Sequence, residues 1–212
     1  MSNHALAERH RLAELLTAAG PDAPTLCAGW TTRDLAAHLV IRERRPDAAA
    51  GIRVAALAGR TKRIQDDYAS RPYEDLVRLF RAGPPVHSLF ALPGADEAAN
   101  TIEYFVHAED VARAGEGWTA QPVPPGRAAA LWRRLPMIAR FEAGRRSPVR
   151  LTLTRPDGES LTVGPAGAPV VRLTGDPGDL VLFVYGRGAR TTLTVDGPQD
   201  AVEALRHVLP LP

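Results

Sequence analysis

The sequence predicts an α-helical bundle followed by a small α+β domain. Two observations support this fold class. In the first two-thirds of the 212-residue chain the apolar residues recur at helical spacing. From Ser147 onward they alternate with polar residues, which is typical of β-strands. We therefore predict two domains, a helical bundle over residues 1–145 and an α+β domain over residues 146–212.

The helices of the first domain are predicted from apolar periodicity, and their ends from glycine and proline. They span residues 2–19, 31–45, 47–57 and 96–114, a short amphipathic stretch within 61–81, and 126–141. Pro136 should kink or break the last of these helices, because proline lacks the N–H that an interior turn needs. Residues 83–94 contain three prolines and are predicted to form a loop.

The second domain begins with a predicted β-hairpin. Residues 149–154 and 161–163 would be its strands, and Pro156-Asp157-Gly158 would form its turn. Further elements are expected in the order strand, helix, strand, helix, over residues 170–173, 176–185, 191–195 and 198–208. We interpret this hairpin together with the later strands and helices as a separate small α+β domain.

Composition argues against several classes of function. The net charge is only +2 although the pI is about 9.0, and the basic residues are scattered, so no nucleic-acid partner is expected. No apolar run approaches the roughly 18 residues of a membrane span, and residues 1–10 are polar, so we predict a cytoplasmic protein with no membrane partner. Cys27 is the only cysteine, which excludes an internal disulfide, and we interpret it as a small buried residue.

Glu103 and His107 lie four residues apart on the helix predicted at 96–114. Such a pair shares one helix face and is often only a pair of surface neighbours. The same spacing recurs in the first helix, in two pairs that we expect to be exposed to solvent: His4 with Glu8, and His10 with Glu14. The spacing alone therefore does not identify a site.

The surroundings of Glu103 and His107 distinguish them from those pairs. Glu109 and Arg113 form another pair on the same helix, which we expect to mark its solvent side. His107 then points about 140° away from that side, toward the core. A buried carboxylate is costly unless a cation or hydrogen bonds compensate it. A bound metal would do so, and so would a Glu–His hydrogen bond that serves only packing.

His38 makes a metal site the favoured interpretation, because this histidine lies between Leu35 and Ile41 on another predicted helix. A single histidine there could be an ordinary core residue. However, helix bundles build metal sites from single residues on one helix and i,i+4 pairs on another. His38, Glu103 and His107 would hold a divalent ion and leave coordination positions open, as catalytic sites do. Zinc is preferred, and nickel or iron would also suit these ligands.

Two aspartates lie about one helical turn from the predicted histidine ligands. Asp34 and Asp110 could each accept the second ring N–H of a histidine and so fix its tautomer. Asp34 could equally complement the dipole of its helix, since it lies in the first turn. For Asp110 we favour a role behind the ligand or toward a substrate.

Two segments resemble those of a known family. The segment from Leu26 to Leu39 resembles the "W-x-x-x-D-L-x-x-H-L" segment of the mycothiol-dependent maleylpyruvate isomerase family, and Glu103 to Ala114 resembles its "E-x-x-x-H-x-x-D-V-x-R-A" motif. The resemblance is to actinobacterial metal-binding members. It implies a DinB-like four-helix bundle with the ligands His38, Glu103 and His107, followed by an α+β domain similar to sterol carrier proteins.

The resemblance also implies an activity. A mycothiol cosubstrate would approach the open metal positions, and the protein would be an isomerase or thiol transferase that acts on a small molecule. Tyr185-Gly186-Arg187 resembles the family's "L-x-G-R" segment, which implies that Arg187 is catalytic and holds a substrate carboxylate. The alternative role for Arg187 is to complement the C-terminal end of a helix dipole.

Two other functions remain open from the sequence. The same ligands could activate water in a metal-dependent hydrolase. The metal could instead be structural, in a non-catalytic module whose second domain binds a ligand or a protein. Mycothiol-dependent turnover would support the isomerase or transferase, and thiol-independent hydrolysis would support the hydrolase. A fully coordinated metal would support the non-catalytic module. A homodimer is also open.

Overall fold

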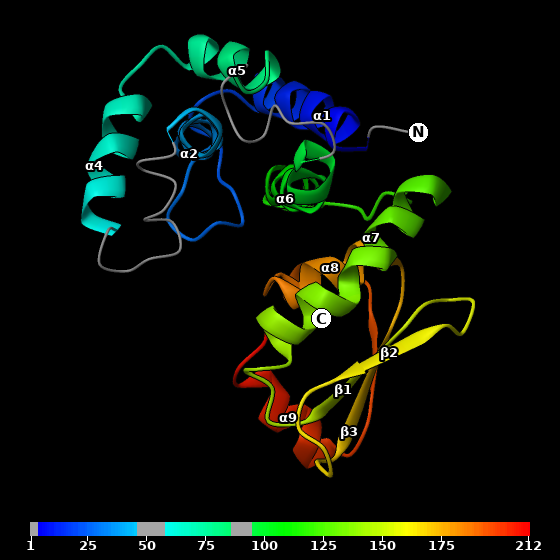
Figure 1. Cartoon of the computed structure of the whole chain (residues 1–212). Helices are drawn as coiled ribbons and strands as arrows, with labels where there is room; N and C mark the ends of the chain where they lie inside the picture. The colour runs from blue at the N-terminus through cyan, green and yellow to red at the C-terminus, as the bar shows by residue number, and fades with distance from the viewer. Residues whose placement is uncertain (1–3, 46–57, 86–94) are drawn as a thin grey trace. The chain divides into compact units, whose positions relative to one another are not determined.

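The computed structural model describes residues 4–45, 58–85 and 95–212 (Figure 1). The helix predicted at 47–57 and most of the loop predicted at 83–94 lie outside these residues. The chain forms two compact units, Met1–Trp118 and Thr119–Pro212. We predicted a boundary between residues 145 and 146, but the structure differs because helix α7 (Pro125–Ile138) packs against α8 (Pro177–Val184) of the second unit.

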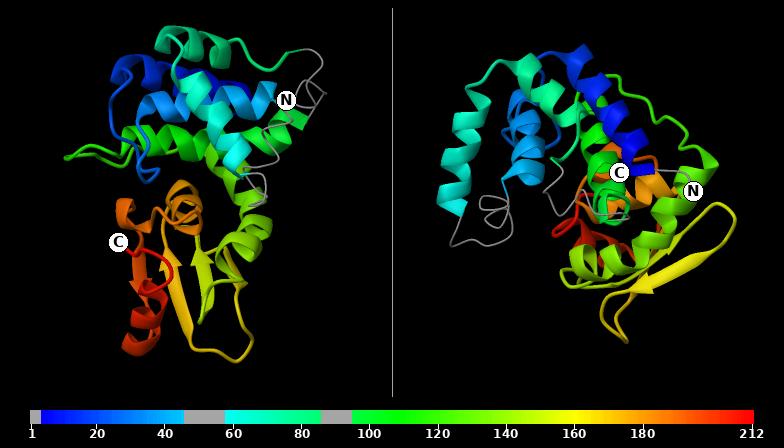
Figure 2. Two further views of the ribbon diagram at one scale, coloured as in Figure 1. Left: turned by 90° about the vertical axis from the view of Figure 1, so that its left-hand side faces the viewer. Right: turned by 45° about the horizontal axis from the view of Figure 1, so that its top comes forward.

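The first unit consists of helices in the part of the chain that the structure describes. These are α1 (His4–Ala19), α2 (Thr32–Arg44), α4 (Ala58–Ala69), α5 (Tyr73–Arg81) and α6 (Ala95–Ala112). Helix α1 lies alongside α6, and α2 packs against α4 and α5 (Figure 2). The predicted amphipathic stretch at 61–81 is therefore two helices. The polar segment between them, with Pro72 before α5, interrupts the helical run.

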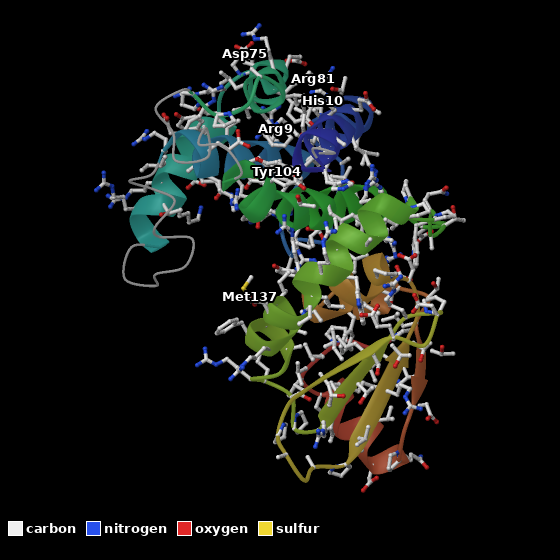
Figure 3. The ribbon with its side chains drawn as sticks, turned by 45° about the vertical axis from the view of Figure 1, so that its right-hand side comes forward. Arg9, His10, Asp75, Arg81, Tyr104 and Met137 are labelled. Carbon is white, nitrogen blue, oxygen red and sulfur yellow. The ribbon has the colours of Figure 1, made fainter. Side chains whose placement is uncertain are left out.

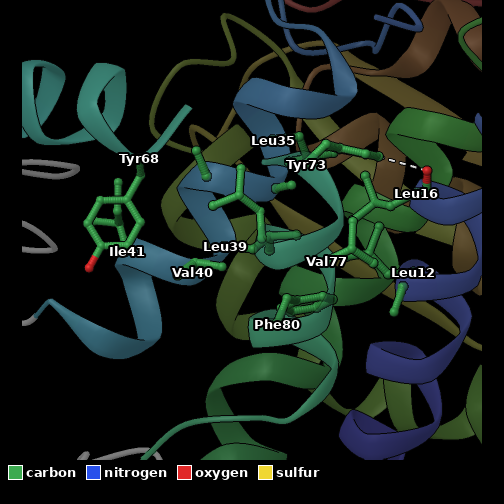
Figure 4. Packing of buried hydrophobic residues seen from close by; sticks show 14 of the residues in the cluster. Leu12, Leu16, Leu35, Leu39, Val40, Ile41, Tyr68, Tyr73, Val77 and Phe80 are labelled. Carbon is green, nitrogen blue, oxygen red and sulfur yellow. Dashed lines mark hydrogen bonds between the residues drawn. The ribbon is translucent and has the colours of Figure 1, made fainter. Parts of the chain in front are cut away.

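Leucine and aromatic side chains fill the core of this unit (Figure 4). Leu12 and Leu16 from α1 meet Leu35 and Leu39 from α2, and Phe80 of α5 joins them. The spacing of four residues within each pair puts both side chains on the same face of the helix. The Tyr73 hydroxyl donates a hydrogen bond of 2.7 Å to the Leu16 carbonyl, which satisfies the polar end of a buried ring.

The second unit is a four-stranded sheet with helices. Its elements are α7, a π-helical turn (Ala139–Ala143), β1 (Arg150–Thr154), β2 (Ser160–Val163), β3 (Val170–Thr174), α8, β4 (Thr194–Asp196) and α9 (Gln199–Arg206). The strand order is β2-β1-β3-β4, in which β1 pairs with β3 in parallel and the other pairs are antiparallel. A helical unit followed by an α+β unit confirms the predicted fold class.

Local sequence features explain how several elements of this unit form and end. Leu151 and Leu153 are buried while their neighbours in β1 are more exposed, as alternation requires. The Asp176 carboxylate caps α8 by accepting a hydrogen bond of 2.8 Å from the Gly178 N–H. Pro136 does not end α7, which continues to Ile138 and then widens into the π-helical turn. Among the described helices, none has the length and apolar character needed to cross a membrane.

Candidate metal centre

His38 from α2 meets Glu103 and His107 from α6. Glu103 Oε1 lies 3.7 Å from Nε2 of His38 and 3.4 Å from Nε2 of His107. The two imidazole rings stand edge to face with their centroids 5.5 Å apart. The structure thus brings together the three side chains that the sequence singled out, around a single carboxylate oxygen.

The start of α2 sets the position of His38. The backbone N–H and the hydroxyl of Thr31 each donate a 2.9 Å hydrogen bond to Asp34 Oδ2. Asp34 therefore stabilises the first turn of the helix, and no hydrogen bond joins it to His38 among the described residues. Of the two roles considered for Asp34, the structure displays the one at the helix terminus. One turn later, the His38 ring packs against Trp30 at 5.0 Å between centroids.

Asp110 lies behind His107. Its carboxylate Oδ2 is 2.9 Å from Nδ1 of His107, and the aspartate is completely buried. A carboxylate at this distance holds the proton on Nδ1, which leaves Nε2 as the nitrogen that faces Glu103 and His38. Asp110, which the sequence indicated as a possible partner of His107, therefore accepts a hydrogen bond from that ring.

Burial and hydrogen bonding shift the three pKa values in different directions. Burial alone would raise the pKa of Glu103, but hydrogen bonds with His107 and His38 outweigh it and lower the pKa well below its usual value. Burial alone would lower the pKa of His107, but hydrogen bonds with Asp110, Cys27 and Glu103 raise it well above 6.5. For His38, burial prevails and the pKa falls. The opposite shifts of the two pKa values favour a protonated His107 beside an ionised Glu103 when no metal is bound.

The donor set fits a divalent ion. The ligand atoms of His38, Glu103 and His107 all lie within 4.8 Å of one another. Donors about 2.0–2.2 Å from one tetrahedral ion would be roughly 3.3 Å apart, close to the distances of 3.4 and 3.7 Å from Glu103 to the two histidines. The Glu103 side chain is 23% exposed, so this set is not sealed from solvent.

Arg42 is a site residue that the sequence analysis missed. Its Nε lies 3.3 Å from Glu103 Oε1, and a second guanidinium nitrogen donates to the Asn100 side chain. Arg42 follows His38 by four residues, so both share a face of α2. The sequence could have indicated Arg42 only through that spacing. Whether its guanidinium reaches α6 depends on how the two helices pack.

Cys27 corrects another prediction. We expected a small buried residue without a polar role, but the thiol is half-buried and lies at the centre. Its Sγ is 3.1 Å from Asp110 Oδ2 and 3.9 Å from His107 Nδ1. The segment before α2 carries it there, and no local pattern in the sequence indicates a contact with residues 80 and 83 positions away.

The solvent side of α6 was also predicted wrongly. Glu109 and Arg113 do pair, but they are only 6% and 3% exposed. Arg11 from α1 also pairs with Glu109, because α1 covers this face. Helix α6 is therefore buried on two sides. His107 faces inward, but the face that carries Glu109 and Arg113 is not exposed to solvent. The side chain of Glu109 is accommodated there by two arginines.

The two pairs on α1 behave differently from each other. His10 and Glu14 are exposed, as expected. Glu8 is completely buried and pairs with Arg11 at 3.3 Å, so the prediction that His4 and Glu8 form an exposed pair is wrong. Helical spacing reveals which residues share a face, but not which face the rest of the fold covers.

Arg187 belongs to the second unit. It follows α8, is half-buried, and donates a 2.7 Å hydrogen bond from its guanidinium to the Tyr185 carbonyl. Its backbone N–H donates to the Leu182 carbonyl at 2.8 Å. These contacts fit an arginine at a helix C-terminus. A catalytic role of Arg187 remains a prediction.

A cavity of about 420 Å³ opens beside Trp30 in the first unit. Its lining combines the indole ring with charged, amide and hydroxyl groups: Ala28, Gly29, Trp30, Asp34, Thr61, Lys62, Gln65 and Asp66. Trp30 lines this cavity and also packs against the His38 ring, with 5.0 Å between centroids. The three candidate ligands are not among the lining residues, and the cavity offers hydrogen-bonding groups to a small polar molecule.

Comparisons with known proteins agree with this architecture. Two solved structures resemble the chain over 91% of its length and 90% of theirs: the mycothiol-dependent maleylpyruvate isomerase (16% identity, TM-score 0.60) and a histidine-to-alanine mutant of that enzyme (14%, 0.61). At these identities the likeness establishes the fold. No curated protein matches the sequence. Residues 3–137 match the profile of the mycothiol maleylpyruvate isomerase N-terminal domain, and the chain therefore belongs to that family.

Proposed function

We propose that this protein is a mycothiol-dependent isomerase or thiol transferase that acts on a small molecule, with a divalent metal ion held by His38, Glu103 and His107. The observation that carries the proposal is the convergence of two imidazole nitrogens on one carboxylate oxygen, at 3.7 and 3.4 Å. Family membership supports the thiol cosubstrate, because the two similar structures are of a mycothiol-dependent enzyme.

Three ligands leave coordination positions for a cosubstrate. A divalent ion bound there would stabilise a thiolate at neutral pH and could polarise a carbonyl group of the substrate. We prefer zinc because it suits two imidazoles and a carboxylate, while nickel and iron also accept such ligands. In this proposal the protein supplies no nucleophile of its own.

The surrounding side chains prepare the ligands. Asp110 keeps the proton of His107 on Nδ1 and so directs Nε2 to the centre. Arg42 lies 3.3 Å from Glu103 and helps to hold its carboxylate ionised. Trp30 packs against the His38 ring, with 5.0 Å between centroids and a tilt of 52°. The chain thus orients both histidines and keeps the carboxylate charged before any ligand binds.

Two sets of polar groups are candidates for recognising the substrate. The cavity beside Trp30 presents carboxylate, amide and ammonium groups, which suits a polar cosubstrate. The family resemblance suggests Arg187 as the group that grips a substrate carboxylate, and the forked guanidinium is well shaped for this task. Replacing Arg187 with lysine should raise KM more than it lowers kcat, because a lysine binds the carboxylate without the bidentate geometry. The homodimer and the cytoplasmic location remain predictions.

Turnover of maleylpyruvate with and without mycothiol tests the proposal. We expect isomerisation that requires mycothiol, is lost in His107→Ala, and persists in His10→Ala. His10 is the matched control, because it also has a glutamate four residues away but lies exposed on α1. Hydrolysis without the thiol would instead favour a metal-dependent hydrolase. Metal binding without turnover of any tested thiol-dependent substrate would favour a non-catalytic module.

A further inference from the structure

The segment that precedes α2 is fastened to α6 at Asp110. The Leu26 N–H donates a hydrogen bond of 3.0 Å to the backbone carbonyl of Asp110. Within the segment, the Thr25 hydroxyl donates to the Trp30 carbonyl at 2.9 Å, and the Trp30 N–H donates to the Cys27 carbonyl at 3.0 Å. These bonds give the segment a defined shape and place the Cys27 backbone within reach of Asp110 and His107.

The thiol and the His107 ring meet at the same carboxylate oxygen. Cys27 Sγ donates to Asp110 Oδ2 at 3.1 Å, and His107 Nδ1 lies 2.9 Å from that oxygen. The sulfur and the ring nitrogen are 3.9 Å apart. Asp110 is completely buried, and a buried carboxylate loses much stability if donors are removed. Two donors on one oxygen restrict the rotation of the carboxylate and, through it, the orientation of the ring.

We propose that Cys27 is a positioning residue of the metal centre. Its thiol holds Asp110 in the orientation that keeps His107 Nδ1 protonated and Nε2 directed toward Glu103 and His38. This inference rests on the proposed function, because it assigns Cys27 a role in the affinity of that centre for a metal. It differs from a ligand role, since the sulfur lies near Nδ1 of His107 whereas the Glu103 carboxylate lies at Nε2 of that ring.

The alternative is that the Cys27 sulfur is itself a metal ligand. Ligand atoms of Cys27, His107 and Asp110 also lie within 4.8 Å of one another. A metal in that set would need a deprotonated thiol and would use Nδ1 in place of Nε2. The 2.9 Å separation of His107 Nδ1 from Asp110 is a hydrogen-bond distance, which favours the positioning role.

Zinc affinity of Cys27→Ala and Cys27→Ser, measured by competition with a chelator, tests the proposal. Partners that orient metal ligands typically contribute 10- to 100-fold in affinity. We expect Cys27→Ala to bind zinc about 10-fold more weakly, at the lower end because the thiol acts through Asp110. Cys27→Ser keeps a hydroxyl donor and should stay within about threefold of the wild type. The thermal midpoint of each metal-free variant reports its folding, and Cys27→Val replaces Cys27→Ala if that variant does not fold.

Three results would overturn the role of Cys27. These are equal zinc affinity in wild type and Cys27→Ala, equal weakening in the serine and alanine variants, or a thiolate-to-metal charge-transfer band in the cobalt-substituted wild type. The last would make the sulfur a ligand. If the wild type itself binds no zinc, the proposed function fails together with this inference. If the wild type binds zinc and the variants match it, only the inference fails.

Discussion

Two charged clusters join α2 to α6, and they differ in the groups that balance the charge of their carboxylate. In one, Arg9 of α1 lies between Glu43 and Tyr104, with Nη1 at 2.7 and 2.9 Å from the two carboxylate oxygens and Nη2 donating to the tyrosine hydroxyl at 2.8 Å (Figure 3). In the other, His38 and His107 surround Glu103. Glu103 and Tyr104 are adjacent in the sequence, yet each serves a different cluster.

The difference lies in what balances the carboxylate. A permanently charged guanidinium neutralises Glu43, and the side chains of Arg9 and Glu43 are only 3% and 0% exposed. Glu103 is 23% exposed, and besides Arg42 its partners are two imidazoles whose charge depends on protons. The Arg9 cluster is therefore a closed structural element, whereas under the proposed function the Glu103 cluster would exchange a proton for a metal ion.

The largest expected effect is on folding stability at the Arg9 cluster. Arg9→Ala leaves the buried Glu43 without its main cation and should lower the free energy of unfolding by about 3–5 kcal/mol. Urea unfolding of the metal-free protein measures this loss. The exposed Glu14→Gln should change it by less than about 0.5 kcal/mol. A loss below about 1 kcal/mol in Arg9→Ala would mean that the cluster does not hold the helices together.

The next effect is on metal affinity at Glu103. Glu103→Gln removes a charged ligand, so zinc affinity should fall by more than about 100-fold, which exceeds the loss from a partner behind a ligand. Calorimetric titration with zinc measures it. The free energy of unfolding of the metal-free variant should fall much less than in Arg9→Ala. The comparison fails if Glu103→Gln unfolds as easily as Arg9→Ala while its zinc affinity is unchanged.

A smaller loss of affinity is expected at Asp110. Asp110→Asn keeps the shape but weakens the hold on the His107 N–H, and zinc affinity should drop by about 10- to 100-fold. Competition with a chelator is a suitable measurement. Thr101→Ser, which alters another buried polar residue of α6, serves as a comparison because the Thr101 hydroxyl donates to the Glu97 carbonyl within the same helix. Unchanged affinity in Asp110→Asn would show that the Nδ1 hydrogen bond is dispensable.

The smallest effect is the pH dependence of the metal-free protein. The pKa of His107 is raised, so its charge stabilises the folded state below pH 6.5, and this stabilisation is lost as pH rises through the folded pKa. The difference in Tm between wild type and His107→Gln should therefore shrink as pH increases from 6 to 9. Arg9→Ala should show no such trend relative to the wild type. A difference that widens with pH would indicate that His107 is buried in its neutral form.

Much of this architecture follows from local sequence patterns. Helical spacing located α1, α2 and α6, and period-two alternation located the sheet. The pair Glu103 and His107, together with His38, could be found because each lies on a strongly helical segment beside apolar residues. The histidine partner Asp110 followed from a spacing of one turn, since residues three apart share a face.

What the sequence did not reveal depends on contacts between distant segments. The burial of Glu109 requires knowledge that α1 covers that face of α6. Cys27 and Arg42 reach the centre only because the helices and the segment before α2 pack in one particular register. The assignment of α7 to the second unit likewise depends on its packing against α8, since its own sequence looks like one more helix of the bundle.

Elemental analysis of the purified protein tests the central claim most directly. The wild type, prepared without chelator, is compared with His38→Ala, His107→Ala, and with a control that removes two exposed histidines, His10→Ala, His207→Ala. We predict one divalent ion per chain in the wild type and in the control, and none in the first double variant. If the wild type carries no more metal than His38→Ala, His107→Ala, the three residues do not form a metal centre.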